Sequence, residues 1–243
     1  VAVGNYALQA NTTGTENVGI GNSALGAVTT NSYNTAVGSR ALISNTAQLN
    51  TAVGCFCMYS NTTGTENTAI GQASLYTNTT GSYNTAVGRY ALRLSTTSNN
   101  NTAVGYQTLD ANTTGSDNTA LGVNALGANT TGSYNIAIGI NALDANTTTS
   151  SNLAIGYESL TANTTGNVSV ALGNNTLAAN TTGAANVALG YNALAANTTA
   201  SNNTAVGRDA LLVNTTGTQN VAIGNYALDA NTTSNNNVAC GMN

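Results

Sequence analysis

Short apolar stretches alternate with stretches rich in Asn, Thr and Gly along the whole chain, with a period of 17 residues. The phrase N-[TV]-A-[VI]-G-x-x-A-L-x-A-N-T-T-G-x-x returns fourteen times, and a partial fifteenth copy (238–243) ends the sequence. Positions within a copy are numbered so that Val1 is position 1. The copy at 35–50 is one residue short after Thr46, where we expect a turn that tolerates a deletion. Residues 1–243 are expected to form a single repeat domain, as a fragment of a longer protein or a filament unit.

Two apolar segments in each copy predict strands. Positions 1–4 are rich in Val, Ile and Thr, and position 8 is Leu in thirteen of fourteen copies, with Met58 the exception. Segments of five or six residues are too short for helices. Each copy is therefore expected to be one coil of an all-β parallel solenoid, with two strands and two turns. Because one coil buries only about two large side chains, stacking between coils has to supply the stability.

Small residues at positions 2 and 4 predict a contact between chains. Position 4 is Gly in all fifteen copies, and position 2 is Ala in fourteen. Side chains alternate along a strand, so we expect positions 1 and 3 to face the core and positions 2 and 4 to face the backbone of a neighbouring chain. The alternative is that the glycines only turn the chain and the alanines are incidental. The expected oligomer interface comprises Ala36, Gly38, Ala52, Gly54, Ala69, Gly71, Ala103, Gly105, Ala120, Gly122, Ala137 and Gly139.

Polar columns accompany the apolar ones. Asn occupies position 11 in twelve of fourteen copies and position 17 in thirteen, and position 12 is always Thr. At the spacing of paired strands, roughly 4.8 Å, identical Asn side chains form hydrogen-bonded ladders. Position 14, often Gly, is expected to need a permissive turn backbone. Asn-Thr-Thr also matches the N-glycosylation acceptor pattern, but the demands of the fold explain a motif that recurs coil after coil better.

The repeat resembles a known family. The runs at 34–38, 135–139 and 220–224 resemble the N-x-[VA]-A-[IV]-G repeat of the YadA-like head of trimeric autotransporter adhesins, and the stretch 101–118 is similar to repeats of phage and surface tail-fibre-like proteins. The resemblance covers the whole chain. It implies a left-handed parallel β-roll that trimerises through its inner strands, on a cell or virion surface or otherwise outside the cell. It supplies no binding motif that carries over.

Composition argues against several kinds of chemistry. The chain has four Arg, eight Asp plus Glu, no His and no Lys, so we expect no enzyme, because acid–base and nucleophilic catalysis draw mainly on these groups. A net charge of −4 argues against binding to nucleic acid. No apolar run is long enough to span a membrane. Cys55 and Cys57 form C-x-C without a partner, so neither a metal nor another cofactor is expected, and Cys57 and Cys240 are expected to be small buried groups.

Variable positions carry the candidate binding residues. Positions 5, 6 and 9 vary most between coils, and Tyr59, Tyr76 and Arg93 occupy position 9 of three successive coils, where we expect them to stack as a stripe. Aromatic residues and Arg are enriched in binding hot spots, although exposed strand positions also accept Tyr without any function. The candidate surface patch comprises Phe56, Tyr59, Tyr76, Arg89, Tyr90, Arg93 and Tyr106.

These features together predict a structural or adhesive extracellular fibre. We expect a rigid homo-oligomer, a trimer, that presents a surface to a host cell or glycan receptor. One alternative is a filament subunit whose chains stack end to end through open coil ends. A less favoured alternative is an ice-binding solenoid, suggested by the Thr columns at positions 12 and 13, although adjacent residues of a strand point in opposite directions.

Overall fold

The computed structural model describes residues 1–242, and the chain forms two compact units, Val1–Asn118 and Thr119–Asn243. Both units are all-β, and no helix occurs among residues 1–242. Each unit is a parallel β-solenoid, as the 17-residue period predicts. That the two units belong to one domain stays a prediction.

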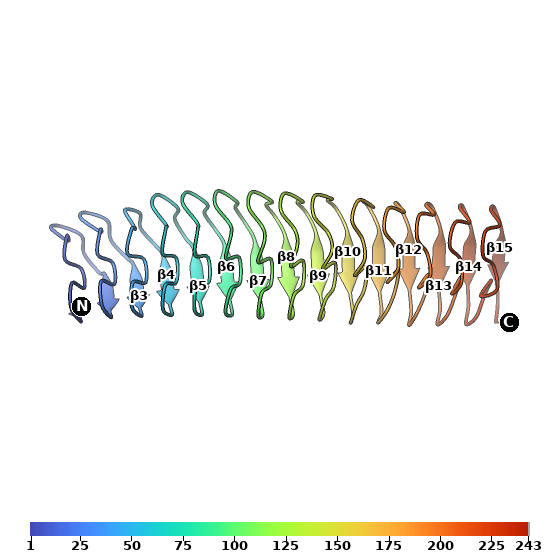
Figure 1. Cartoon of the computed structure of the whole chain (residues 1–243), viewed down its shortest axis with the longest axis horizontal. Coiled ribbons are helices and arrows are strands. Elements are labelled where there is room, and N and C mark those ends of the chain that lie inside the picture. Colours follow the sequence, from blue (N-terminus) through green and yellow to red (C-terminus); the bar gives the residue numbers. More distant parts are fainter. Residues whose placement is uncertain (243) are drawn as a thin grey trace. The chain divides into compact units, whose positions relative to one another are not determined.

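One short strand marks each coil. In unit 1 these are β1 (Ala2–Val3), β2 (Val18–Ile20), β3 (Thr35–Val37), β4 (Thr51–Val53), β5 (Thr68–Ile70), β6 (Thr85–Val87) and β7 (Thr102–Val104). In unit 2 they are β8 (Thr119–Leu121), β9 (Ile136–Ile138), β10 (Leu153–Ile155), β11 (Val170–Leu172), β12 (Val187–Leu189), β13 (Thr204–Val206), β14 (Val221–Ile223) and β15 (Val238–Cys240). Within each unit every strand pairs in parallel with the next, as Figure 1 shows.

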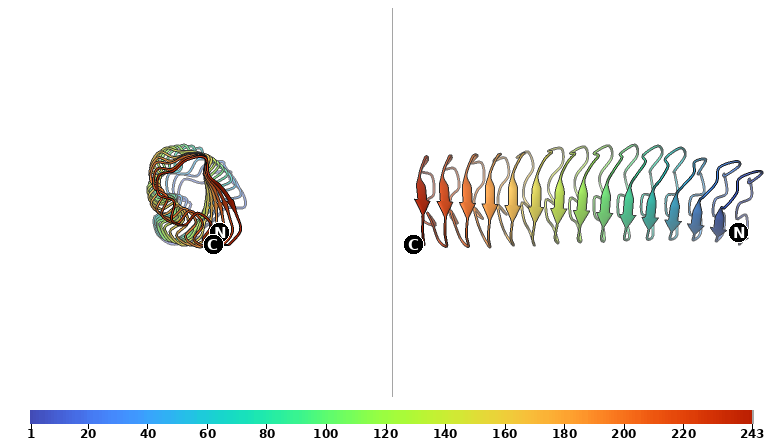
Figure 2. Two further views of the ribbon diagram at one scale, coloured as in Figure 1. Left: turned by 90° about the vertical axis from the view of Figure 1, so that its right-hand side faces the viewer. Right: turned by 180° about the vertical axis from the view of Figure 1, so that it is seen from behind.

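Equivalent positions of neighbouring coils are paired throughout each unit. Ala52 is opposite Ala69, and Ala154 is opposite Ala171. Turn residues are also bonded along the stack, since the amide of Leu8 donates to the carbonyl of Ala24 at 3.0 Å. Seen along the stack, the individual coils trace closed loops (Figure 2). The backbone of one coil therefore finds its hydrogen-bond partners in the coils before and after it.

The second strand expected in each coil does not form. Residues at positions 6 and 8 have positive φ angles in coil after coil, for example 57° at Tyr6 and 51° at Leu8. Left-handed residues cannot continue an extended strand, so positions 5–8 make a turn instead. The prediction of two strands was wrong because a single Leu beside a small residue is equally compatible with a packed turn.

The two faces of the strand are the reverse of those expected. Position 2 is the buried one, and Ala36, Ala52, Ala69, Ala103, Ala120 and Ala137 are fully buried within their own unit. Positions 1 and 3 point outwards and are half-buried or exposed. These alanines therefore cannot form the expected contact with a neighbouring chain. The narrow coil holds only small groups opposite the column of position-8 leucines, which are fully buried from Leu25 to Leu211.

The glycines of the expected interface are also constrained by neighbouring coils of the same chain. Gly38, Gly54, Gly71, Gly105, Gly122 and Gly139 have φ angles between 128° and 142°, a region that side chains rarely adopt. A Cβ added at Gly71 would lie 2.5 Å from the carbonyl oxygen of Gly88 in the next coil. The limit on size at position 4 thus comes from the adjacent coil of the same chain.

Asn ladders form as predicted. At position 11, Asn61 donates to the side-chain oxygen of Asn45 at 2.7 Å, and Asn78 donates to that of Asn61 at 2.7 Å. At position 17, the amide group of Asn67 donates to the side-chain oxygen of Asn50 at 3.2 Å. These side chains are buried, so the ladders form a polar part of the core in which most amide groups have hydrogen-bond partners.

The turn around positions 12–14 has two further properties. The hydroxyl of Thr62 at position 12 donates to the carbonyl of Thr79 in the next coil at 2.8 Å. The 16-residue coil omits position 13 there, and Asn45 still donates to the carbonyl of Ala47, as Asn61 does to that of Gly64. The glycines at position 14 do not have positive φ angles. A Cβ at Gly14 would instead lie 2.5 Å from the side-chain oxygen of Asn11.

Candidate functional site

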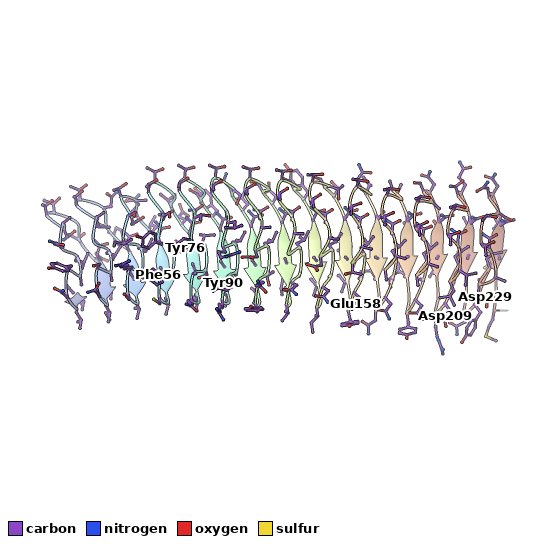
Figure 3. All side chains as sticks on the ribbon, viewed as in Figure 1. Phe56, Tyr76, Tyr90, Glu158, Asp209 and Asp229 are labelled. Atoms are coloured by element: carbon purple, nitrogen blue, oxygen red, sulfur yellow. The ribbon has the colours of Figure 1, made fainter. Side chains whose placement is uncertain are left out.

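The residues of the candidate surface patch lie together in unit 1, in two groups beside one hollow. Figure 3 shows Phe56, Tyr76 and Tyr90 on the same part of the molecule, near β4 to β6. The first group comprises Phe56, Tyr59 and Tyr76, and the second comprises Arg89, Tyr90, Arg93 and Tyr106. That this patch binds anything stays a prediction.

Stacked rings organise the first group. Tyr59 and Tyr76, at position 9 of adjacent coils, lie with their ring centroids 5.2 Å apart and their planes at 15°. Phe56 packs tilted against Tyr59 at 6.0 Å, and the guanidinium of Arg40 lies 5.8 Å from the Phe56 centroid. The parallel register places position-9 side chains one strand spacing apart, which is close to the distance at which aromatic rings stack. The predicted stacking of these two tyrosines is confirmed.

Cations organise the second group around Tyr90. The guanidinium carbons of Arg89 and Arg93 lie 4.4 and 5.1 Å from the centroid of the Tyr90 ring, within the range of cation–π attraction. Arg89 also donates to the Tyr90 hydroxyl at 2.8 Å. Tyr106 packs against Tyr90 at 6.4 Å. Contacts on the ring and on the hydroxyl hold Tyr90 in place.

Asp110 neutralises Arg93. Two nitrogens of the guanidinium bond the two carboxylate oxygens of Asp110, which occupies position 9 of the next coil, at 2.7 and 2.9 Å. The carboxylate is mostly buried, and its hydrogen bond raises the pKa of Arg93 above the ordinary value. Such bidentate pairs have a fixed geometry. The site therefore combines aromatic rings with a donor–acceptor pair of no net charge.

A hollow of about 270 Å³ lies between the two groups, lined by Ala73, Tyr76, Thr77, Tyr90, Arg93 and Leu94. Ala73 occupies position 6, where the preceding coil has Phe56 and the following coil has Tyr90. The small side chain of Ala73 leaves this space beside Tyr76 and Tyr90. The hydroxyl of Thr77 donates to the carbonyls of Arg93 and Ser95, so it is engaged within the fold.

Two residues of this site were missed at the sequence level. Asp110 was not among the candidate residues, although it directly follows Arg93 in the position-9 column. Ala73 was not singled out because a small residue carries no chemical signal. Both residues can be found by comparing each position of a coil with the same position of the next coil, because the parallel stacking places these side chains next to each other.

An exposed apolar face runs along the strands of both units. At position 3, Ile70 and Val104 of unit 1 are 42% and 37% exposed, and Ile155 and Ile223 of unit 2 are 36% and 42% exposed. Position 1 adds Thr in β3 to β7, but Ile, Leu or Val in β9 to β12. Large exposed apolar patches mark interaction surfaces in soluble proteins. The face of unit 2 is the more apolar of the two.

Cysteines and carboxylates form no further reactive site among the described residues. Cys57 is buried, with its sulfur 3.2 Å from the carbonyl oxygen of Ala69 and 3.1 Å from the hydroxyl of Ser74, and burial raises its pKa to about 11. Cys240 is exposed, contrary to expectation, because position 3 faces outwards. Residues 1–242 contain no group of three His, Cys, Asp or Glu residues that could hold a metal ion. Within that range no helix has the length and hydropathy that a membrane span requires.

No protein-family model, curated protein or solved structure matches the chain. The resemblance to YadA-like heads therefore stays an expectation from the repeat motif, and the functional argument depends on the geometry.

Proposed function

We propose that the chain is a structural and adhesive segment of an extracellular or surface fibre that assembles as a homotrimer and presents the candidate surface patch for attachment to cells or glycans. The observation that carries the proposal is the exposed apolar face of the strands at positions 1 and 3. It replaces the Ala/Gly face as the expected contact between chains.

Burial of this face supplies the driving force for assembly. Each position-3 side chain that becomes covered contributes on the order of 1 kcal/mol, because about half of its surface is already removed from water in the single chain. The contribution is repeated at every coil, so a weak contact adds up along a unit. The parallel register also spaces these side chains evenly, which suits a contact between identical chains.

The test is the mass of the particle in solution. Multi-angle light scattering of the wild-type chain should give three times the 24.2 kDa of one chain. The double variant with Ile155→Asp and Leu121→Asp has charge on the exposed face of unit 2, while its buried residues are unchanged. It should have the mass of one chain and the circular dichroism of the wild type. Ile136→Thr, which copies the residue of unit 1 at position 1, should weaken assembly more mildly.

Val168→Asp is the matched control. Val168 is 59% exposed in the same unit but lies in the turn at position 16, away from the strands, so its substitution should leave the mass unchanged. A wild-type chain that is monomeric at high concentration would rule out the trimer. Particles whose length grows with concentration would favour the end-to-end filament instead.

A further inference from the structure

We propose that the hollow between Tyr76 and Tyr90 is a binding site for one neutral pyranose ring of a glycan. This inference rests on the proposed adhesive function and names the chemical class of its ligand.

Shape limits the ligand to a single ring. The volume of about 270 Å³ is just below the range of drug-sized pockets, roughly 300 to 1,000 Å³. Ala73, Leu94 and the two tyrosines Tyr76 and Tyr90 all contribute to its lining. The hollow lies between the coil that carries Ala73 and Tyr76 and the next coil, which carries Tyr90 and is roughly 4.8 Å away. A flat ring with its substituents at the rim fits such a space.

The walls suit the carbon face of a sugar. Tyr59 stacks on one side of the Tyr76 ring, which fixes that ring and leaves its remaining surface to the hollow. Tyr90 is fixed by Arg89 and Arg93. Rigid aromatic rings give contact area with little loss of conformational entropy, and the C–H groups of a pyranose, which carry partial positive charge, are attracted to the negative face of a ring.

Charge at the rim favours a neutral sugar over an acidic one. Arg93 is the cation that lines the hollow, and its charge is balanced by the bidentate bond to Asp110. An acidic sugar would have to compete with a carboxylate that is already bound and mostly buried. Sugar hydroxyls both donate and accept, so they match a guanidinium and a carboxylate side by side. An aliphatic side chain would leave this pair without new partners.

Saturation-transfer NMR on the full chain tests the proposal. The probes are the methyl pyranosides of mannose, galactose and glucose, with N-acetylneuraminic acid and N-acetyltyrosinamide as the acidic and aromatic comparators. We expect transfer to the ring C–H protons of at least one neutral glycoside. Ala73→Tyr fills the hollow with the residue that the next coil already carries at position 6, so it should abolish this transfer.

Asn175→Tyr is the matched control, since it adds the same side chain at position 6 of a coil in unit 2, at a φ of 55°. It should keep the wild-type signal, whereas Tyr76→Leu should reduce transfer at least tenfold. The absence of transfer to every neutral glycoside would overturn the proposal, as would transfer that survives Ala73→Tyr or that is confined to a comparator. Light scattering on the same samples reports the oligomer separately, so a failed trimer is not confused with a failed site.

Discussion

The side-chain oxygen of Asn78 is buried and accepts no hydrogen bond. The amide group of Asn78 donates to Asn61, but the next coil has Ser95 where most coils have Asn, and Ser95 lies 2.5 Å from the hydroxyl of Ser98 instead. A buried polar atom without a partner costs on the order of 1 to 3 kcal/mol. The ladder is interrupted here at a single residue.

Ser95→Asn should repair the ladder. Its amide group would donate to Asn78 as Asn78 does to Asn61, and the free energy of unfolding should rise by about 1 to 2 kcal/mol. Chemical denaturation checks this value. Ser82→Asn is the control, because the next coil already has Asn99 at this exposed position and its side-chain oxygen accepts from the Ser82 amide at 2.8 Å. If both variants shift stability equally, the unpaired oxygen is not the cause.

Cys57 should make stability depend on pH in the alkaline range. Burial raises the pKa of its thiol from 9.0 to about 11, so the folded state resists a deprotonation that the unfolded chain undergoes. The stabilisation is fully present below pH 9 and is lost as pH rises through 11, by an amount of about 2 to 3 kcal/mol. The measurement is the difference between wild type and Cys57→Ala, which restores the usual residue of this column. A difference that is constant from pH 8 to pH 11 would contradict the argument.

At the scale of the coil, Gly71 shows how closely neighbouring coils approach. Gly71→Ala has to accommodate both a φ of 135° and a Cβ that lies 2.5 Å from the carbonyl of Gly88. We expect a loss of about 3 to 5 kcal/mol, which combines backbone strain with overpacking.

Gly241→Ala separates the two causes. Gly241 has a φ of 140°, but nothing lies within 4 Å of its hypothetical Cβ. This variant should lose only about 1 to 3 kcal/mol, the cost of the strained backbone. Thermal and denaturant unfolding of the two variants gives the comparison, and equal losses would show that the close approach to the next coil is unimportant.

The period, the parallel pairing and the Asn ladders could be predicted from sequence because the same residue recurs at the same position of nearly every copy. The direction of the faces could not. A rule that places large side chains inside predicts that Val or Ile at position 3 faces the core and that Ala at position 2 faces outwards. The structure has the reverse arrangement, because the interior of this coil is too narrow for two rows of large side chains. Residues such as Leu25, fully buried at a φ of 52°, show that tertiary packing overrode the local preference for a strand.

At the scale of each whole unit, the core differs from that of an ordinary globular domain. Its large apolar members come mainly from position 8, with Ala around them and buried amides at positions 11 and 17. The Val and Ile side chains that would normally form a core lie outside instead. The stability of a single chain therefore depends heavily on hydrogen bonds between coils. The exposed Val and Ile side chains would contribute hydrophobic free energy only if another surface covered them.

The candidate site was predictable to the extent that its residues share columns. Tyr59, Tyr76 and Arg93 were found from spacing alone, because parallel register turns a sequence interval of 17 into spatial contact. The hollow at Ala73 and the pairing with Asp110 depend on contrasts between successive coils, and a search for chemical motifs overlooks such contrasts.

Equivalence of the coils has a consequence for how such a chain can change over generations. Neighbouring coils within a unit meet through the same pairs of positions, and in the 16-residue coil at 35–50 the shortened turn still has hydrogen bonds to the coils on either side. Recombination between one repeat and the next would therefore insert or delete a whole coil without creating a foreign junction. Copy number can drift at little cost to folding, and recognition residues can diversify in one repeat while the others preserve the scaffold.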